Sequence, residues 1–202
     1  VCSNFTLGTY GSIDGNAKGF QPIGTGKGAG PGGGEVAVGS KNPGGAGHGG
    51  RGGNGWLPSS TGGIEYGPTN KPTWPGSAGG GSPYFSLRGG AGGGLVWIIA
   101  THAQLDGTIS ADGADGHESG NRNWDGSGGG SGGGIYIQCQ HLSGRGVLHA
   151  NGGRGGNWSG GGAGGRIALV YEKSTWEGRV QAHGGLGSWT EEFPVARRGD
   201  LG

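Results

Sequence analysis

The residue types needed for nucleophilic or phosphate chemistry are present, but their spacing fits neither. A catalytic serine needs a neighbouring base, an orienting acid and a sharp strand-to-helix turn, whereas Gly126-Ser127-Gly128 lies inside a glycine tract. The glycine tracts also lack the Gly-Lys-Ser/Thr ending and the following helix of a phosphate-binding loop. We therefore expect no catalytic residue and no bound nucleotide or other cofactor.

Metal-binding residue types are also present without the usual motifs. The histidines are His48, His102, His117, His141, His149 and His183. The chain has no His-x-x-x-His or Cys-x-x-Cys spacing, which is typical of zinc sites. We therefore expect no metal ligand. His149 should lie on a polar strand face and be solvated.

An acidic cluster raises calcium as an alternative to that expectation. The acidic residues are Asp106, Asp112, Asp115, Glu118 and Asp125. Calcium favours several oxygen ligands from one loop, and 112–116 faintly resembles a calcium-binding β-roll turn, but the repeated nonapeptide of those turns is missing. Asx side chains that cap β-turns explain the same pattern.

Glycine dominates the composition and limits the kind of core that the chain can build. The 202 residues include 60 Gly, and 30% of residues are hydrophobic, well below the usual share for globular proteins. We therefore expect thin layers a few strands deep. Because glycine loses the most backbone entropy on folding, repeated hydrogen bonds between neighbouring segments or subunits must offset that cost.

Charge and hydropathy exclude several partners. The net charge is +1, with 14 basic against 13 acidic residues, so nothing directs the chain to nucleic acid or an anionic membrane. No run of 18 apolar residues could span a membrane. The start at Val1, without a signal peptide, suggests a processed protein or a segment of a larger one.

An internal repeat lies within the glycine-rich sequence. The template Gly-x-aliphatic-x-Ala-(Asp/Asn/His)-Gly occurs at 107–113, 146–152 and 178–184, with a weaker copy at 11–16. In each copy the aliphatic residue and the Ala are two apart, so they share one face of a strand. The residues between them, Ser110, His149 and Gln181, are polar, which indicates a half-buried strand.

A second apolar run precedes each full copy of the template. These runs are 95–100, 135–139 and 167–171, and they follow the glycine tracts 89–94, 126–134 and 160–165. Each run is short, rich in branched residues and bounded by glycine, as β-strands are. The run 95–100 is apolar on both faces, so we expect it to be the most buried strand.

The glycine tracts are either flexible linkers or extended, polyproline-II-like segments that pack closely. We favour ordered packing because the tracts recur in step with the strands. One repeat cannot bury a face alone, so neighbours must stack. The expected fold class is all-β: a glycine-rich β-solenoid or layered β-sandwich with ordered polyglycine segments and no significant helix.

The chain is expected to form one glycine-rich β domain over 1–202. Residues 1–19 hold the first repeat copy and 89–187 hold three repeats. Residues 20–88 are a Pro/Gly-rich insertion or a docking arm, which contains the strand-like run 35–38. Residues 188–202 form a tail.

The repeated pattern of glycine tract, Ile-x-Ile, Gly-x-aliphatic-x-Ala-Asn-Gly and Arg166-Ile167-Ala168-Leu169 resembles glycine-rich extracellular repeat proteins of microbial eukaryotes and bacteria. The resemblance covers residues 89–187. It implies a β-solenoid fold and a role at the cell surface or in a matrix, and it implies no chemistry.

Five tryptophans fall in expected loops or glycine tracts: Trp56, Trp74, Trp124, Trp158 and Trp189. Such rings either plug gaps between glycine segments, anchor an interface, or stack on sugar rings. We favour plugging over the other two roles.

Two N-glycosylation sequons begin at Asn4 and Asn157. Aligning the repeats places Leu7 opposite Leu142, which points Asn4 inward and leaves Asn157 as the better glycan site. The same alignment puts Cys2 and Cys139 on one face but two residues out of line. Directly stacked strands would then hold their Cα atoms about 8 Å apart, beyond disulfide range, so an internal disulfide, free thiols and an interchain bond all remain open.

The expected function is a non-enzymatic extracellular structural subunit that self-assembles into a fibre, filament or matrix by stacking or strand addition. The partner is then a further copy of the chain, with bound or covalent glycans as additional partners. The alternative is a carbohydrate-binding or adhesive module at the cell surface. An enzyme acting on polysaccharide is disfavoured because the aligned column Asn16, Asp112, Asn151 and His183 is too mixed.

Overall fold

The described part of the chain folds into eight β-strands. The computed structural model describes residues 1–36, 42–56, 60–118 and 126–187, and in that part the only helix is the three-residue 3₁₀ helix η1 (Pro83–Phe85). The strands are β1 (Cys2–Leu7), β2 (Ser12–Asp14), β3 (Leu95–Leu105), β4 (Thr108–Ser110), β5 (Gly134–Ser143), β6 (Val147–His149), β7 (Arg166–Ser174) and β8 (Arg179–Gln181). The prediction of an all-β fold without significant helix is therefore confirmed for the described residues.

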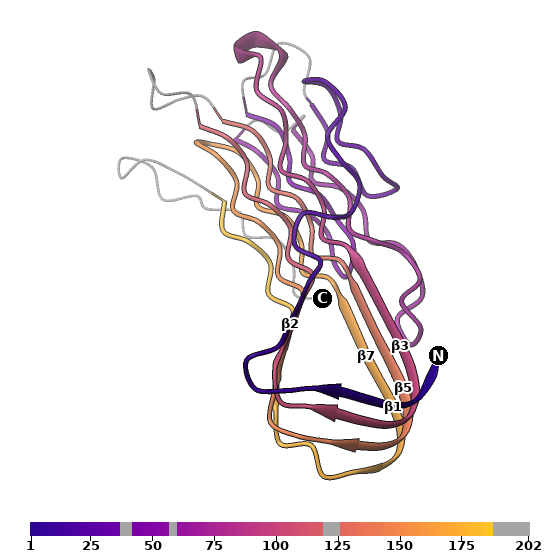
Figure 1. Ribbon diagram of the computed structural model, residues 1–202. Coiled ribbons are helices and arrows are strands. Elements are labelled where there is room, and N and C mark those ends of the chain that lie inside the picture. Colours follow the sequence, from indigo (N-terminus) through magenta and orange to yellow (C-terminus); the bar gives the residue numbers. More distant parts are fainter. Residues whose placement is uncertain (37–41, 57–59, 119–125, 188–202) are drawn as a thin grey trace.

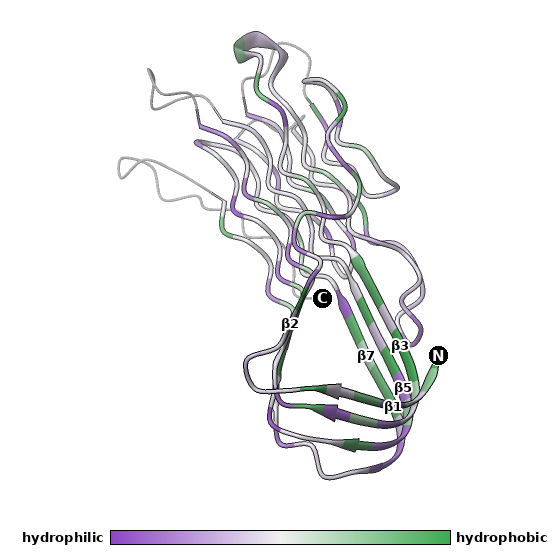
Figure 2. Ribbon diagram, viewed as in Figure 1, coloured by the Kyte–Doolittle hydropathy of each residue, from purple (hydrophilic) through white to green (hydrophobic). Residues whose placement is uncertain are grey.

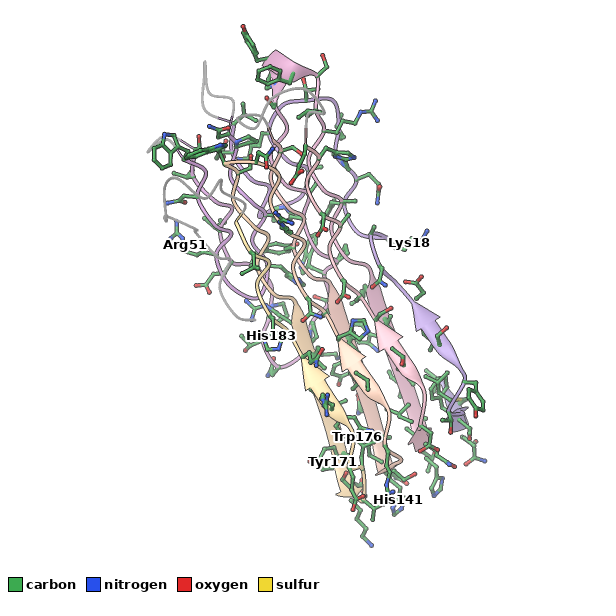
Figure 3. The ribbon with its side chains drawn as sticks, turned by 90° about the vertical axis from the view of Figure 1, so that its left-hand side faces the viewer. Lys18, Arg51, His141, Tyr171, Trp176 and His183 are labelled. Atoms are coloured by element: carbon green, nitrogen blue, oxygen red, sulfur yellow. The ribbon has the colours of Figure 1, made fainter. Side chains whose placement is uncertain are left out.

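Consecutive strands alternate between two sheets. One sheet has the order β1-β3-β5-β7 and the other β2-β4-β6-β8, and every pairing is parallel. We call an odd strand and the even strand after it a rung, so that β1 and β2 form rung one and β7 and β8 form rung four (Figures 1 and 3). The repeated aliphatic residue sets the register of the second sheet: Ile13, Ile109, Leu148 and Val180 are successive partners.

The long strands of the first sheet bend partway along their length, which gives each rung three sides (Figure 1). In β5 the core-facing residues are Ile135, Ile137 and Cys139 before the bend and Leu142 after it, so the alternation of inward and outward residues shifts by one. The three sides enclose one apolar core (Figure 2). Its buried members are Ile98, Ala103, Leu105, Ile109, Ala111, Ile135, Ile137, Cys139, Leu142, Leu148 and Ala150.

The expectation that 95–100 forms the most buried strand is wrong. Leu95 and Trp97 of β3 are 38% and 39% exposed, whereas the first four residues of β5 are all buried. The cause is the short β1, whose pairing with β3 runs only from Ala100 to Leu105. Within the described chain, the first half of β3 therefore has a strand neighbour on one side only.

Glycine-rich segments run away from the sheets side by side (Figure 1), and backbone hydrogen bonds join them. In segment 126–134 every third N–H group, from Ser127, Gly130 and Gly133, donates to segment 111–117. The N–H groups of Gly128 and Ser131 donate to segment 77–80, and those of Gly129 and Gly132 donate to segment 160–163. Three more segments, which contain residues 46, 90–93 and 153–156, donate N–H groups to its carbonyl oxygens. This segment therefore has six neighbours. We call the described residues of 15–35, 43–56, 60–94, 111–118, 126–133, 150–165 and 182–187 the glycine bundle.

The described part of 20–88 belongs to this bundle. The N–H of Ala46 donates to the Gly129 carbonyl at 2.9 Å, and that of Gly79 donates to the Gly90 carbonyl at 2.9 Å. These bonds connect the described part of this segment to the glycine tracts of the repeats. Part of the run 35–38 and the tail 188–202 lie outside the described residues.

Candidate functional site

The two ends of the stack of rungs differ from its middle. Ile109 and Leu148, in the inner rungs, are 0% exposed, whereas their counterpart Val180 in rung four is 45% exposed. Tyr171, whose register partner is the buried Cys139, is also exposed, and Figure 3 shows Tyr171 and Trp176 along this edge. The core of the rungs is therefore covered in the middle of the stack and uncovered at rung four.

Rung one is the opposite end of the same stack. Phe5, Leu7 and Ile13 pack against the core but are only half-buried. Strands β1 and β2 each have a strand partner on one side in the described chain, as do β7 and β8. Both ends thus present parallel sheet edges with apolar side chains behind them, and unpaired edges of this kind can accept another strand.

A column of Asx side chains connects the rungs on the side of the second sheet. Asn16 Oδ1 accepts the Asp112 N–H at 2.7 Å, Asp112 Oδ1 accepts the Asn151 N–H at 2.6 Å, and Asn151 Oδ1 accepts the His183 N–H at 2.9 Å. The column that sequence analysis judged too mixed for catalysis thus fastens each rung to the next.

Two other acidic residues of the cluster act in a similar way, whereas Glu118 lies 3.9 Å from the Arg154 guanidinium. Asp106 Oδ1 accepts the Arg145 N–H at 3.1 Å, and Asp115 Oδ1 accepts the Arg154 N–H at 2.7 Å. Asp125 lies outside the described residues. Among the residues that are described, no three His, Cys, Asp or Glu side chains gather as metal ligands would. Asx capping therefore accounts for Asp106, Asp112 and Asp115.

His149 is not simply solvated, as the sequence suggested. Its Nδ1 lies 2.8 Å from Asp112 Oδ2, and its strand neighbour in register is Ser110. A Ser, His and Asp therefore lie together, which sequence spacing does not reveal. The Ser110 hydroxyl is buried and donates to Asp14 Oδ1 at 3.4 Å, so the serine is oriented toward a carboxylate and not toward the imidazole as a nucleophile requires.

A buried polar cluster joins the glycine bundle to β7. The ring of His48 is 0% exposed and stacks on Tyr66 with 4.7 Å between ring centroids. Burial lowers the pKa of His48 to about 4, and burial raises the pKa of Tyr66 to about 12. The neutral imidazole donates from Nδ1 to the Gly132 carbonyl at 2.7 Å, while Arg166 donates to the His48 and Tyr66 carbonyls. The cluster fastens three segments together.

The remaining histidines are dispersed. His102 and His141 are register partners on the outside of the first sheet, with parallel rings 4.9 Å apart. His117 Nδ1 lies 2.9 Å from the Arg88 carbonyl, and His183 ends the Asx column at rung four (Figure 3).

The two cysteines occupy one column of the first sheet. Cys2 pairs with Ala100, and the constant offset between β3 and β5 places Cys139 next to Ala100 on the other side. Two strand spacings separate the thiols by about 9.6 Å, and both are free. Cys139 is buried, which raises the pKa of its thiol.

The sequence alignment behind the earlier cysteine and sequon arguments is therefore wrong by two residues. Leu7 pairs with Leu105. The offset of 39 residues between β3 and β5 places the counterpart of Leu105 two positions beyond Leu142, just after the end of β5. The turn of rung one, from Leu7 to Gly11, is two residues longer than the turn from Leu105 to Gly107, and the alignment ignored this difference. Asn4 consequently faces outward and is exposed.

The second sequon lies at the far end of the bundle, where the chain turns between two glycine segments. Asn157 is half-buried, and Ser159 of the same sequon is 2% exposed. Trp158 between them is buried and packs edge-on against Trp56, with ring centroids 4.7 Å apart. Trp158 is thus buried between the chain segments at this turn and packs against a second tryptophan.

The other expected tryptophans do not join that pair. Trp74 is 45% exposed and lies near the start of β5, next to Gly134. Trp124 and Trp189 lie outside the described residues. Sequence analysis missed an aromatic contact on the first sheet. Trp97 packs on Tyr136 with 4.8 Å between ring centroids, and Lys71 lies over both rings. The contact depends on strand register, which the sequence leaves open.

Comparison with known proteins adds no relative to this description. No protein-family model, curated protein sequence or solved structure matches the chain. In the part of the chain that the structure describes, no helix has the length and apolarity to cross a bilayer.

Proposed function

We propose that the protein is a non-enzymatic structural subunit that stacks with further copies of itself into a fibre, filament or matrix outside the cell. The observation that carries the proposal is that, among the described residues, the stack of rungs has an unpaired parallel edge at each of its two ends. Addition to an open edge does not close the structure, because each added copy presents the same edge again.

The fold that we infer for this subunit is a β-solenoid flanked by polyproline-II-like glycine segments. Rungs that follow the chain in order, with offsets of 39 and then 32 residues between partners, are the arrangement of a solenoid. Segment 126–134 contacts the same neighbour through every third N–H group, which is the period of a polyproline II helix.

The distribution of exposed apolar residues supports end-to-end stacking. Exposed large apolar side chains on rung four or the segment after it are Val170, Tyr171, Val180 and Leu186. Val1 and Tyr10 are exposed on rung one. Capping repeats of solenoids that remain monomeric carry polar outer faces, whereas rung four also exposes Tyr171 and Val180.

An extracellular location agrees with the exposed sequon residue Asn4, which is placed where a glycan could be attached without disturbing the core. The two thiols are separated by a strand and need no oxidising environment, so they do not bear on the location. Glycans attached to an assembly of this kind would project from its sides.

The carbohydrate-binding alternative has weaker support. Rings that bind sugars form an exposed platform, but Trp158 is buried against Trp56 at the far end of the bundle, and Trp74 lies beside the sheets. These three rings therefore belong to two separate places.

The direct test of the proposed function is assembly of the purified full chain. We expect sedimentation velocity to show species that grow with concentration, and negative-stain electron microscopy to show elongated particles. Val180→Lys places a charge on the uncovered core of rung four and should abolish growth. Ile64→Lys is the matched control, because Ile64 is an exposed aliphatic residue of the bundle, 55% exposed against 45% for Val180. A chain that stays monomeric at high concentration, or growth that survives Val180→Lys, would contradict the proposal.

A further inference from the structure

We infer that copies join head to tail and in register, so that rung four of one copy is continued by rung one of the next as though it were a fifth rung. In this arrangement β8 pairs with β2 of the next copy and β7 with β1, all parallel. The inference rests on the proposed self-assembly and specifies its interface.

The first argument comes from a hydrogen bond that recurs at every rung of the second sheet. The N–H groups of Thr108, Val147 and Arg179 donate to the carbonyls of Gly11, Gly107 and Gly146, at 3.1, 3.0 and 3.0 Å. Each donor belongs to the later rung and each acceptor to the earlier one. At the junction the same rule joins the Ser12 N–H of the next copy to the Gly178 carbonyl.

A second recurring bond runs in the opposite direction. The N–H groups of Gly15, Ala111 and Ala150 donate to the carbonyls of Ser110, His149 and Gln181 in the following rung, at 2.8, 2.8 and 2.9 Å. At the junction this rule joins the Ala182 N–H to the Asp14 carbonyl of the next copy. One end of the subunit therefore offers the donor and acceptor that complete both bonds of the other end.

The side chains of the two ends are compatible in the same register. Continuing the inner columns places Val180 beside Ile13 and Trp176 beside Leu7 of the next copy, and all four face the core. On the outside, Lys173 falls beside Asn4 and Gln181 beside Asp14, so no like charges meet in these columns. The interface covers the exposed Val180 and the half-buried Ile13, Leu7 and Trp176.

A two-fold junction between identical ends does not satisfy both sheets. Placing β7 against β7 of a second copy makes the pair antiparallel, and the rotation that does so carries the second sheet of that copy away from β8. Only one of the two edges is then paired, and the glycine bundles point in opposite directions. Head-to-tail addition pairs both edges and keeps the bundles side by side.

The junction is expected to be weaker than an internal step of the stack. The Asx column ends on His183, which has no side-chain amide or carboxylate to accept the next N–H. At the other end, the Asn16 N–H is already bonded to Asp14 Oδ1 of its own copy at 2.8 Å. Polymers should therefore break at copy boundaries and dissociate on dilution.

Disulfide trapping tests the register. In a Cys2→Ser, Cys139→Ala background, Lys173→Cys combined with Asn4→Cys places two thiols in adjacent strands of neighbouring copies, about 4.8 Å apart at Cα and within disulfide range. After mild oxidation, a non-reducing gel should show a ladder of covalent multimers. His141→Cys with Lys173→Cys is the internal control, because these residues are partners within one chain.

Two further variants separate the outcomes. Lys173→Cys with Thr6→Cys is two residues out of register, about 8 Å apart, and should give roughly tenfold less multimer because that separation exceeds disulfide range. Lys173→Cys alone should give no covalent dimer.

Equal trapping by the Thr6 pair overturns the register, and a dimer from Lys173→Cys alone overturns the head-to-tail arrangement. If sedimentation shows that the background variant forms polymers but no pair is trapped, this interface is wrong while self-assembly stands; if it forms no polymers, the proposed function fails as well.

Discussion

Each repeat of the chain has two halves, a rung of two strands and the glycine segments that flank it, and the two halves are stabilised by opposite means. In the strand half, side chains such as Ile137 and Leu148 fill a core and are 0% exposed. In the glycine bundle, segments approach so closely that a side chain would not fit: a Cβ on Gly130 would lie 2.0 Å from the Ala91 carbonyl oxygen. One half depends on the presence of side chains and the other on their absence.

This difference explains how a chain with few hydrophobic residues builds a compact fold. Buried backbone groups must be hydrogen-bonded, and in the bundle they bond to one another between segments. Gly130, for example, donates to Ala114 at 2.9 Å and accepts from Gly153 at 2.8 Å. Each such bond contributes about 1 kcal/mol, and their number offsets the entropy that glycine loses on folding.

The largest expected effect comes from adding one methyl group to the bundle. Gly130→Ala forces the neighbouring segment to move by more than 1 Å, because real Cβ-to-oxygen contacts exceed 3 Å. We expect a loss of roughly 4 kcal/mol or more in the free energy of unfolding, measured by chemical denaturation followed by circular dichroism.

Gly26→Ala is the matched control for that substitution. No atom lies within 4 Å of the added Cβ at Gly26, and the alanine reduces the entropy of the unfolded chain, so stability should stay the same or rise slightly. If Gly130→Ala is as well tolerated as Gly26→Ala, the bundle is not closely packed and the contrast between the two halves disappears.

The second prediction removes side-chain atoms from the strand half, where the first prediction added a methyl group to the glycine bundle. Leu148→Ala removes a fully buried side chain from the core and should cost about 3 kcal/mol. Val180→Ala removes the counterpart at the exposed end and should cost less than about 1 kcal/mol in the monomer. Denaturation of both variants, at a concentration too low for assembly, measures the difference; equal losses would mean that rung four is covered in the monomer.

The strand half was largely predictable from the sequence, because the polar or apolar character of each side chain there indicates whether it faces solvent or the core. The spacing of Ile109, Leu148 and Val180 identified the rungs, and the weak first copy at 11–16 falls into the same register. The failures have local causes. The longer turn after Leu7 shifted the alignment by two residues, and the bend near Cys139 changes which side chains face the core.

The glycine half was predictable only as ordered or disordered, and not in its arrangement. A glycine segment carries no side chain to indicate which of its six neighbours lies on which side, so nothing in the sequence reveals that Ala46 donates to Gly129. The position of His48 was unpredictable for the same reason. Its neighbours Gly132, Tyr66 and Arg166 come from three separate segments.

The third prediction concerns the pH dependence of stability that His48 causes at the boundary between the glycine bundle and β7. Its pKa is about 4 in the folded chain and about 6.5 in the unfolded chain. Below pH 6.5 the unfolded state therefore binds a proton that the folded state does not bind until pH 4. Folding loses about 3 kcal/mol as the pH falls through this window.

Replacement of the imidazole isolates this contribution from the carboxylates that titrate in the same range. His48→Gln should be less stable than the parent protein at pH 7, because the ring stacks on Tyr66, but the difference should shrink or change sign by pH 4. Denaturant midpoints at several pH values measure it. A difference that stays constant from pH 7 to pH 4 would show that His48 is accessible to protons in the folded chain.

The smallest expected effect concerns the Asx column, which lies where the glycine bundle meets the strands of the second sheet. Asp112→Ala removes the acceptor of the Asn151 N–H and the partner of His149, and should cost about 1 kcal/mol. Asp112→Asn retains Oδ1 as an acceptor and should recover most of that loss, because the capping bond does not need a charge. Thermal denaturation of the two variants separates a cap from an ion pair. If Asn is no better than Ala, the charge of Asp112 toward His149 is what matters, and the rungs are joined by electrostatics where the Asx geometry indicates hydrogen bonding.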